Sequence, residues 1–431
     1  MYNITFIGAG PSTIMAVLEL IKNNYQGKIA IVEKGNSMET RSKNEVVSGF
    51  SGAGCWSDSK LSSSLSVGGS IPNMTIKDLE EYEHTILDCY NYFNKLAGNT
   101  NTIEWSLTSN YDTKNTSLNW DIHKTCHVGT EKGRDIYAQM EEYLKKQPNI
   151  DLIFNTRVKD VSFCANDYVL VTDGEEDIVT EKVVLATGQK DILPSVIIDK
   201  FNLSTKSRAL QLGVRVEDQM NSQYEEIIKA NYDFKFVKEY DYNNVKVRVR
   251  TFCCNSGNAH VCAENTGTFI CFNGHAYKHQ DINNHSVNYG IMCEVEGLND
   301  YNTKEDQIDL MKKINSYPTW EKDNFTDNLP KAKRKLLDGF DFLIGYYPQE
   351  VVDSLTDFVY NLNKLVDLSK AVFYYPEVKL SGSVPNINYD TFETEFKNLY
   401  MIGDCTISRG ILKSSYIGYK FAKNILEETN A

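Results

Sequence analysis

A glycine-rich loop holds the first side chains that could do chemistry. The stretch SGAGCWSDSKL, residues 51–61, places a cysteine at position 55 and a lysine at position 60. A dithiol relay of the kind used by disulfide reductases needs a second cysteine five residues after the first, and Lys60 stands there instead. The spacing therefore excludes a dithiol relay in this loop. We interpret Cys55 as a small packing residue, with a catalytic thiolate as the alternative. Lys60 is a candidate catalytic group, with a solvated loop lysine as the alternative.

His127 is a second candidate catalytic residue. It lies in TCHVGT, just before a helix predicted over residues 131–146, and Thr130 is a plausible N-cap of that helix. An imidazole changes charge near neutral pH, so His127 could act as an acid or base. A histidine that only stabilises the fold is the alternative.

Residues 245–254 combine an alternating strand with two adjacent cysteines. Arg248 and Arg250 lie on its polar side and could hold an anionic substrate group, although an exposed sheet face is the simpler interpretation. Adjacent cysteines rarely form an unstrained disulfide, so we interpret Cys253 and Cys254 as structural thiols.

Three histidines further along, His275, His279 and His285, follow a strand and enter a loop. No acidic residue stands near them at a spacing typical of metal sites. We therefore expect no metal site in this chain.

The first 35 residues have the pattern of a strand, a glycine-rich turn, a helix and a second strand. Gly8-Ala-Gly10 ends the apolar run YNITFI, and a helix is predicted to begin near Pro11. Glu33 ends the second strand, twenty residues after Thr13, which replaces the usual third glycine. This arrangement is the dinucleotide-binding fingerprint: the glycines admit a pyrophosphate, the helix amides face it, and the acid accepts ribose hydroxyls.

A strand near the other end of the sequence indicates which dinucleotide is bound. LYMIGD, residues 399–404, ends in Gly403-Asp404, and an amphipathic helical pattern follows from Ile411. A strand, Gly-Asp and a helix in this order resemble the flavin-binding end of two-dinucleotide flavoproteins, in which the Asp holds a ribitol hydroxyl of FAD. Asp404 as a helix N-cap is the alternative. The helix start, with Arg409 and Gly410, would stabilise the reduced flavin anion.

The ordered motifs GAGPST, SGAGCWSDSKLS, TCHVGTEKGRDI, VVLATG, LGVRVE, RTFCC, YYPEVK and LYMIGDCTISRGI cover residues 2–428. Together they resemble the FAD-dependent dehydrogenase-like proteins, in a short form without an additional N-terminal domain. The resemblance implies FAD and a fold rather than a defined substrate. The family's FCMC reads FCCN here, which puts any inherited cysteine chemistry in doubt.

Candidate cofactor contacts come from every part of this motif series. In the resembling proteins the loop of residues 51–61 lies along the FAD, so Gly52 and Gly54 would admit the cofactor and Trp56 would pack near it. The full set of candidates is Gly8, Gly10, Pro11, Ser12, Thr13, Glu33, Lys34, Arg41, Gly52, Gly54, Cys55, Trp56, Ser57, Val158, Ala186, Thr187, Gly188, Gly403, Asp404, Arg409, Gly410 and Ile411.

The predicted fold class is α/β, a Rossmann-like FAD-binding domain with a central parallel sheet and an inserted mixed α+β domain. The FAD domain is expected over 1–75, 120–190 and 376–431, with a helical insertion over 76–119 and a substrate or cap domain over 191–375. Segments 151–161 and 167–174 predict a β-hairpin, and helices are predicted over 78–97, 304–315, 331–340 and 349–366.

Composition narrows the class of partner. The net charge of −13 argues against a surface that binds nucleic-acid phosphates, and no apolar run is long enough to span a bilayer. Ten unevenly spaced cysteines without an export signal predict reduced thiols and a cytoplasmic location. The oligomeric state stays open.

The leading hypothesis for function is an FAD-dependent oxidoreductase that moves hydride between a small organic substrate and flavin N5. No second glycine-rich fingerprint occurs between residues 190 and 375, so NAD(P)H, if it reduces the flavin, would bind transiently. The alternatives are a flavin-dependent modifier of nucleic-acid bases and a non-enzymatic flavin-binding sensor or assembly subunit.

Overall fold

The computed structural model divides the chain into two compact units. Unit 1 comprises Met1–Glu104, Cys126–Lys206 and Val384–Ala431, and unit 2 comprises Trp105–Thr125 and Ser207–Ser383. The residues described are all except 43–44, 46, 56–57, 190, 208, 266–269, 278–284, 299–303, 316–320, 323–329, 332, 336–339, 341–342, 344, 380–382 and 431. The predicted domain limits stay predictions; by contacts, the breaks fall after residues 104, 125, 206 and 383.

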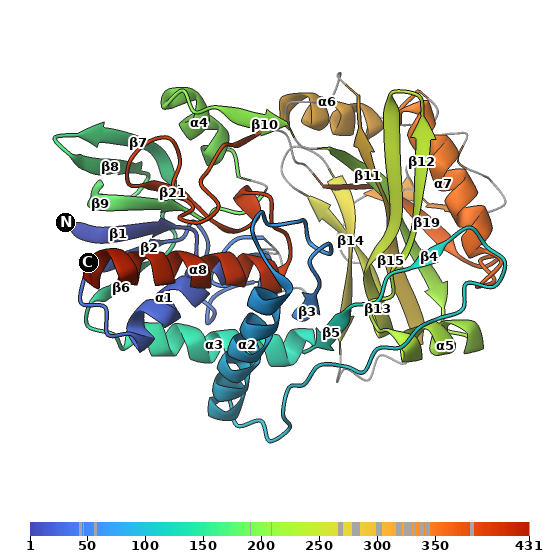
Figure 1. The fold of residues 1–431 in the computed structure, drawn as a ribbon, viewed down its shortest axis with the longest axis horizontal. Coiled ribbons are helices and arrows are strands. Elements are labelled where there is room, and N and C mark those ends of the chain that lie inside the picture. The colour runs from blue at the N-terminus through green and yellow to red at the C-terminus, as the bar shows by residue number, and fades with distance from the viewer. Residues whose placement is uncertain are drawn as a thin grey trace. The chain divides into compact units, whose positions relative to one another are not determined.

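A seven-stranded sheet forms the centre of unit 1 (Figure 1). Its strands are β1 (Tyr2–Ile7), β2 (Ile29–Val32), β6 (Ile150–Ile153), β7 (Val158–Cys164), β8 (Asp167–Thr172), β9 (Ile178–Leu185) and β21 (Leu399–Met401). The order is β6-β2-β1-β9-β8-β7, and β21 also pairs with β9. β6, β2, β1, β9 and β21 run parallel, whereas β7 and β8 form an antiparallel hairpin attached to β9. The predicted fold class, with a β-α-β unit and a central parallel sheet, is confirmed.

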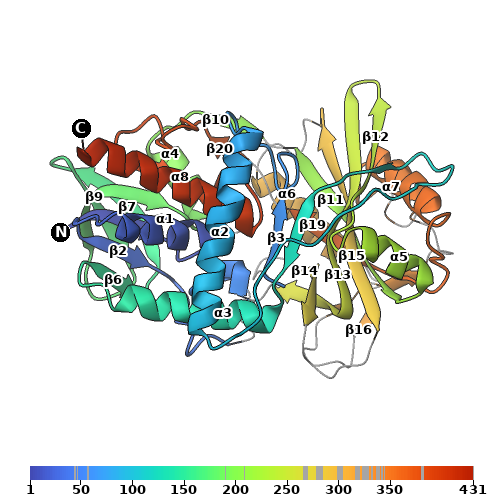
Figure 2. The same ribbon diagram turned by 60° about the horizontal axis from the view of Figure 1, so that its bottom comes forward.

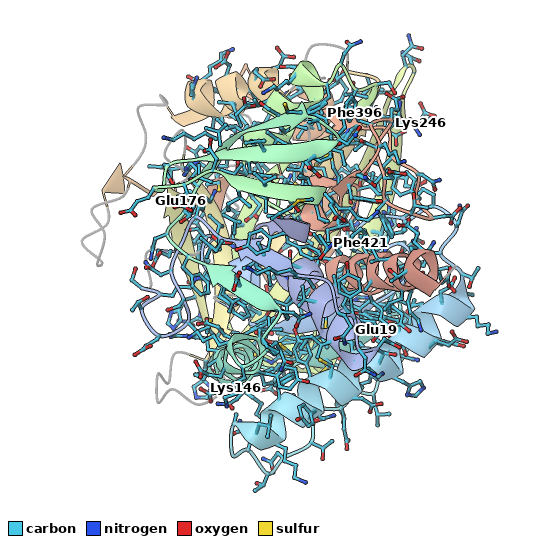
Figure 3. All side chains as sticks on the ribbon, turned by 90° about the vertical axis from the view of Figure 1, so that its left-hand side faces the viewer. Glu19, Lys146, Glu176, Lys246, Phe396 and Phe421 are labelled. Atoms are coloured by element: carbon cyan, nitrogen blue, oxygen red, sulfur yellow. The ribbon has the colours of Figure 1, made fainter. Side chains whose placement is uncertain are left out.

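Helices cover this sheet because its central strands are apolar on both faces. The helices of unit 1 are α1 (Pro11–Lys22), α2 (Ile76–Leu96), α3 (Thr130–Lys145), α4 (Leu193–Lys200) and α8 (Ile411–Asn430). α1 and α8 lie side by side (Figures 1 and 2). Gly418 allows their close approach, since a Cβ there would lie 1.9 Å from the Ser12 carbonyl oxygen. Phe421, labelled in Figure 3, packs edge-on against Phe6 of β1 at 5.8 Å.

Unit 2 is built on a second, mostly antiparallel sheet. Its main strands are β11 (Leu210–Gln219), β12 (Phe236–Tyr242), β13 (Val245–Asn265), β14 (Ile270–Tyr277), β15 (Ser286–Glu296) and β19 (Val372–Lys379). β4 (Asn119–Trp120) and β18 (Lys333–Lys335) lie at the two ends of the order β18-β19-β11-β15-β13-β12-β4. The shorter elements of the chain are β3 (Lys60–Ser63), β5 (Lys124–His127), β10 (Thr205–Ser207), β16 (Glu321–Lys322), β17 (Pro330–Lys331), β20 (Ser383–Pro385) and the 3₁₀ turns η1 (Gly52–Cys55) and η5 (Gly403–Cys405).

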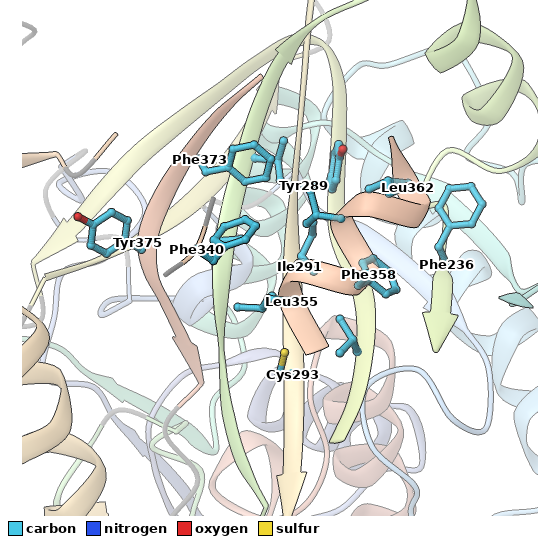
Figure 4. Close-up of a cluster of buried hydrophobic side chains, with 14 of the residues drawn as sticks. Phe236, Tyr289, Ile291, Cys293, Phe340, Leu355, Phe358, Leu362, Phe373 and Tyr375 are labelled. Carbon is cyan, nitrogen blue, oxygen red and sulfur yellow. The ribbon is translucent and has the colours of Figure 1, made fainter. Parts of the chain in front are cut away.

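One large apolar core holds unit 2 together. The helices α5 (Ser222–Ala230), α6 (Lys304–Asn315) and α7 (Gln349–Leu362) all contribute to it. Leu355, Phe358 and Leu362 of α7 meet Tyr289 and Ile291 of β15 (Figure 4). Alternate residues of the strands enter this core, as the period of two in a strand requires.

Several local predictions need correction. Gly129, not Thr130, is the N-cap of α3, and its φ of +91° is one that glycine adopts without strain. Residues 151–153 belong to the parallel edge strand β6, so the hairpin consists of β7 and β8 alone. The helix predicted over 331–340 is wrong where the structure describes it, because Lys333–Lys335 pairs with β19 as an edge strand.

The other predicted helices are confirmed within a few residues. None of the helices among the described residues is both long enough and apolar enough to cross a lipid bilayer.

Candidate nucleotide-binding site

The predicted cofactor residues gather at one edge of the unit 1 sheet. Parallel strands end at the same edge, so the segments that follow β1, β2, β9 and β21 all leave the sheet there. β1 lies between β2 and β9, and the chain order reverses at this point. In open α/β sheets, ligands bind beyond the carboxyl ends of the strands at such a reversal.

Two glycines after β1 leave room at this edge. Gly8 has a φ of +104°, and a Cβ there would lie 2.5 Å from the Ala186 carbonyl oxygen, so only glycine fits between the ends of β1 and β9. Gly10 caps α1 with an ordinary extended backbone, and a Cβ there would meet no described atom within 4 Å. Among the described residues, the space beside Gly10 at the start of α1 is therefore open. Pro11 occupies the first turn, and Thr13 Oγ1 donates a hydrogen bond to the Gly8 carbonyl.

Glu33 ties three backbone segments together from the end of β2. Its Oε2 accepts a hydrogen bond from the amide of Ala9 (2.9 Å), and its Oε1 accepts from the amides of Gly35 (2.9 Å) and Gly49 (2.8 Å). The side chain is only 5% exposed. Glu33 thus shapes the turn after β1, a role that the sequence did not reveal, while its predicted contact with a ribose stays a prediction.

Arg41 and Lys34 also act on the protein itself. The buried Arg41 guanidinium donates to the carbonyls of Glu45, Phe50 and Gly52, which holds these three backbone groups in place. Lys34 lies 2.5 Å from Asp191, just beyond β9. Burial alone would raise the pKa of Asp191, but Lys34 outweighs it and holds the pKa below its ordinary value.

The glycine-rich loop of residues 51–61 reaches the turn after β1. The Ser51 amide donates to the Ala9 carbonyl (2.8 Å), and a Cβ on Gly52 would lie 3.5 Å from the Gly10 Cα. A Cβ on Gly54 would lie 3.0 Å from the hydroxyl oxygen of Tyr137. The loop therefore borders the open space at Gly10. The side chain of Cys55 and the residues Trp56 and Ser57 lie outside the described residues.

The segments after β9 and β21 complete the edge. The Ile402 amide donates to the Leu185 carbonyl (2.9 Å), and the Cβ position of Gly403 lies 2.6 Å from Ser12 Oγ at the start of α1. Val158, in contrast, is buried in the core at the start of β7. Ala186 donates its amide to the Ile7 carbonyl (2.9 Å), while Gly188, with φ of +74°, has no atom within 4 Å of its Cβ position.

Around the start of α8, polar groups link the segments to one another. Asp404 accepts a hydrogen bond from Ser414 Oγ, and because α8 begins at Ile411, Asp404 is not its N-cap. The Arg409 guanidinium donates to Gln189 Oε1, which follows β9. Gly410, like Gly10, has nothing within 4 Å of its Cβ position. A second helix therefore begins after a strand at this edge, next to a glycine whose Cβ position is clear of described atoms.

Buried polar atoms without a hydrogen-bond partner among the described residues recur in these segments. They include Ser51 Oγ, Thr187 Oγ1, Gln189 Nε2 and Ser408 Oγ. Each comes from a loop that the sequence assigns to the cofactor site. Since buried polar groups are nearly always satisfied in folded proteins, these atoms indicate a polar ligand or ordered water at this edge.

The two predicted catalytic residues meet at a third residue, Asp58. Lys60 Nζ lies 3.6 Å from Asp58 Oδ2, and His127 Nε2 lies 3.7 Å from the same oxygen. All three side chains are largely buried, and Asp58 Oδ2 has no hydrogen bond among the described residues. The Gly129 amide donates to the Asp58 carbonyl (2.9 Å), which joins this cluster to the start of α3. Both distances are too long for hydrogen bonds but short enough for the charge of Asp58 to act on the lysine and the histidine.

Lys413, which the sequence did not single out, is buried in the first turn of α8. Its ammonium donates to the carbonyls of Leu65 and Gly69, and burial lowers its pKa from the ordinary 10.5 to about 8. A cation is therefore held close to the helix start by neutral carbonyls.

This lysine should make the stability of the protein rise with pH. Because the folded state binds the proton less tightly than the unfolded state, the penalty is complete below pH 8 and disappears between about pH 8 and 10.5, a change of about 3 kcal/mol. We expect Lys413→Met to lose that rise, as measured by urea unfolding across this range. Lys397→Met, at an exposed position, should keep it, and an equal slope in both variants would contradict the prediction.

In unit 2, the predicted anion-binding arginines have partners. Arg250 lies 2.7 Å from Glu294 on the neighbouring strand, and Arg248 lies 3.9 Å from Glu239. Cys253 and Cys254 form no disulfide with any described residue, and the buried thiol of Cys254 donates to the Phe234 carbonyl (3.2 Å). His279 and the side chain of His275 lie outside the described residues.

Comparisons with known proteins give distant similarities. No family model matches the sequence. A protein of Clostridium beijerinckii described as "Uncharacterized protein" is 21% identical over 470 residues, covering 98% of this chain and 80% of that protein.

Among solved structures, the chain is similar to several flavoproteins. Glycine oxidase from Geobacillus kaustophilus has a TM-score of 0.46 at 12% identity, covering 99% of this chain and 95% of that one. A flavoprotein/dehydrogenase from Cytophaga hutchinsonii has a TM-score of 0.45 at 12% identity, covering 99% and 79%. L-proline dehydrogenase from P. horikoshii has a TM-score of 0.43 at 11% identity, covering 99% and 93%. Identities and TM-scores this low do not support a function, so any function must be argued from the residues of this chain.

Proposed function

We propose that this protein is an FAD-dependent oxidoreductase that acts on a small organic substrate. One observation carries the proposal: α1 and α8 both begin at the same edge of one parallel sheet, each beside a glycine, Gly10 or Gly410, whose Cβ position has no described atom within 4 Å. A dinucleotide with a pyrophosphate and a flavin that becomes anionic on reduction would use both positive helix ends.

The residues present fit such a cofactor. Gly10 and the first amides of α1 would receive the pyrophosphate. One lone pair of Glu33 Oε2 would remain for an adenosine ribose hydroxyl, since among the described residues Ala9 alone donates to that oxygen. Thr187 Oγ1, Gln189 Nε2 and Ser408 Oγ would gain the partners that they lack within the described protein. Asp404 and Gly410 would serve the flavin end. When bound, FAD supplies hydride acceptance and donation at N5.

The remaining chemistry belongs to the cluster of Asp58, Lys60 and His127. Hydride removal from a carbon that bears a hydroxyl or amine also requires a base for the heteroatom proton. His127 is the candidate for this base, and the Asp58 carboxylate would stabilise the imidazolium that results. Lys60 would balance the charge of Asp58 while His127 is neutral.

A spectroscopic experiment tests the cofactor and the reaction class together. The purified chain should show the visible flavin spectrum, or acquire it when FAD is added, and candidate donors should bleach that spectrum anaerobically. NADH or NADPH as the donor would indicate a reductase with transient nicotinamide binding, whereas a metabolite donor would indicate a dehydrogenase or oxidase. His127→Gln should retain the spectrum but slow bleaching at least about tenfold. A protein that takes up no FAD overturns the proposal, and bound FAD that no donor reduces would leave a non-enzymatic flavin-binding role.

Net charge and cysteine spacing support a proposal for the partner and the cellular location. The partner is a small molecule rather than nucleic acid, in keeping with the net charge of −13. We also propose a cytoplasmic location, since the ten cysteines show no disulfide-type spacing.

A further inference from the structure

The unit 2 sheet has two unlike faces. Leu212, Val214 and Val216 of β11 enter the apolar core, so their alternating neighbours, Gln211, Gly213, Arg215 and Glu217, lie on the other face. That second face is polar, yet Arg215 is 0% exposed. A fully buried guanidinium is costly unless hydrogen bonds and charge compensate it.

Arg215 is only partly satisfied by its neighbours. Its Nε (3.1 Å) and Nη2 (2.5 Å) both donate to Oδ1 of Asn288, and Nη2 also donates to the Cys253 carbonyl (2.8 Å). Asn255 Nδ2 donates to the same two oxygens, at 2.9 Å to Cys253 and 3.0 Å to Asn288. Two oxygens thus serve most of the donors in the cluster.

The donors that remain outnumber the acceptors. Arg215 Nη1 and Asn288 Nδ2 are buried without a hydrogen-bond partner among the described residues, and each carries two N–H groups. Asn255 Oδ1 is the corresponding acceptor without a donor. Glu377 Oε2 is 3.9 Å from Arg215 Nη1, too far for a hydrogen bond but close enough to balance charge. The cluster therefore lacks an acceptor-rich group with two oxygens.

The backbone around this cluster is shaped to hold it. A β-bulge between Phe252 and Asn255, with Cys253 at a φ of +48°, turns the Cys253 carbonyl toward Arg215. A Cβ on Gly274 of β14 would lie 1.8 Å from Arg215 Nη2 and 2.0 Å from Asn288 Oδ1. A side chain at Gly274 would fill the place that the guanidinium occupies.

We propose that Arg215, Asn288 and Asn255 form a binding site for the carboxylate group of a small organic molecule. A carboxylate accepts two parallel N–H bonds from a guanidinium and matches the donors that Nη1 and Nδ2 offer. Burial alone would lower the pKa of Arg215, but Cys253 and Glu377 outweigh it, so the guanidinium stays charged. Carboxylate binding at this site does not depend on the proposed function; only the statement that the bound molecule is the substrate rests on it.

The motif series points to the same place. LGVRVE contributes Arg215, RTFCC contributes Cys253, and YYPEVK contributes Glu377. Segments separated by up to 162 positions in the chain thus meet around one side chain that has donors to spare. Arg248 and Arg250, which the sequence favoured for this role, are already near carboxylates of the protein.

Carboxylate binding can be measured without any flavin. Acetate, benzoate and succinate, each compared with its primary amide, would be added to the full-length protein while its thermal unfolding and heat of binding are recorded. We expect the carboxylates, but not the amides, to bind and raise the unfolding midpoint. Asn288→Asp keeps the shape of the side chain but replaces the Nδ2 donor with a negatively charged carboxylate oxygen beside Arg215. It should therefore weaken carboxylate binding at least about tenfold.

Arg250→Gln is the matched control, because it removes an arginine from the same sheet that already pairs with Glu294; carboxylate binding should be unchanged. Arg215→Lys keeps the charge but not the planar fork, and binding should fall. The inference is overturned if none of the three carboxylates binds the wild type, or if Asn288→Asp binds them as tightly. A flavin-free protein that binds carboxylates would keep this site and overturn the proposed function, whereas an FAD-loaded protein that ignores them would do the reverse.

Discussion

Replacing Gly10 with valine should abolish FAD binding while the protein remains folded. The φ of −77° and ψ of 178° at Gly10 suit any residue, and none of the atoms that the structure describes lies within 4 Å of the Cβ position. The new side chain would therefore occupy only the space in front of α1, where the pyrophosphate is expected. We expect FAD affinity to fall at least 100-fold, a loss of about 2.7 kcal/mol, in a fluorescence titration of the apoprotein.

The control for this substitution is Gly174→Val, in the turn after β8. Its Cβ position lies 3.4 Å or more from the nearest described atoms, which belong to Thr172 and Thr156, so a valine fits there as well. The free energy of unfolding of both variants, measured in urea, should stay within about 1 kcal/mol of the wild type, because a valine in place of a glycine N-cap costs about that much. If Gly10→Val bound FAD as tightly as the wild type, the cradle would be wrongly placed.

Replacing Glu33 with glutamine should destabilise unit 1 strongly. Three backbone amides point at the two carboxylate oxygens of Glu33, and a glutamine must turn an N–H group toward at least one of them. A buried donor would then face a donor, and the charge that strengthens the other bonds would be lost. We expect the free energy of unfolding to fall by about 3 kcal/mol, measured by urea denaturation.

Glu395→Gln provides the comparison, because Glu395 also accepts two hydrogen bonds, from the amide and hydroxyl of Ser204, but is exposed. Water can replace those bonds, so its cost should stay below about 1 kcal/mol. Equal losses in the two variants would show that the buried network at Glu33 does not hold the turn after β1. A loss of FAD binding by Glu33→Gln without any loss of stability would instead favour a direct contact with ribose.

Local patterns were enough to predict most elements of unit 1. The apolar run before Gly8, the glycines themselves and the helical spacing after Pro11 are short-range signals, and the backbone requires them wherever such a turn occurs. β1, α1, β2, β21 and α8 accordingly appear where the sequence places them. The segment at 331–340 failed because a short charged stretch has no period of its own, and pairing with β19 decides its conformation.

Some residues of the candidate site could likewise be predicted from the sequence, whereas the partners of others could not. Spacing in the sequence identified Gly8, Gly10, Glu33, Lys60 and His127 as residues able to bind or react. It did not reveal that Glu33 and Arg41 hold the protein's own backbone, because hydrogen-bond partners of a side chain depend on which loops arrive beside it. Asp58 became significant only when Lys60 and His127 were found within 4 Å of it.

The strand-turn-helix at the start of the chain and the order of its parts follow from the sequence alone, because glycine geometry and apolar periodicity act within a few residues. Which charges are already paired depends on the folded arrangement of distant segments. The sequence around Arg215 has the pattern of an ordinary buried strand. Its guanidinium has donors to spare because the neighbouring strands, which come from distant parts of the chain, offer too few acceptors. Whether a polar group is satisfied is a property of its surroundings in space, and spacing along the chain does not contain it.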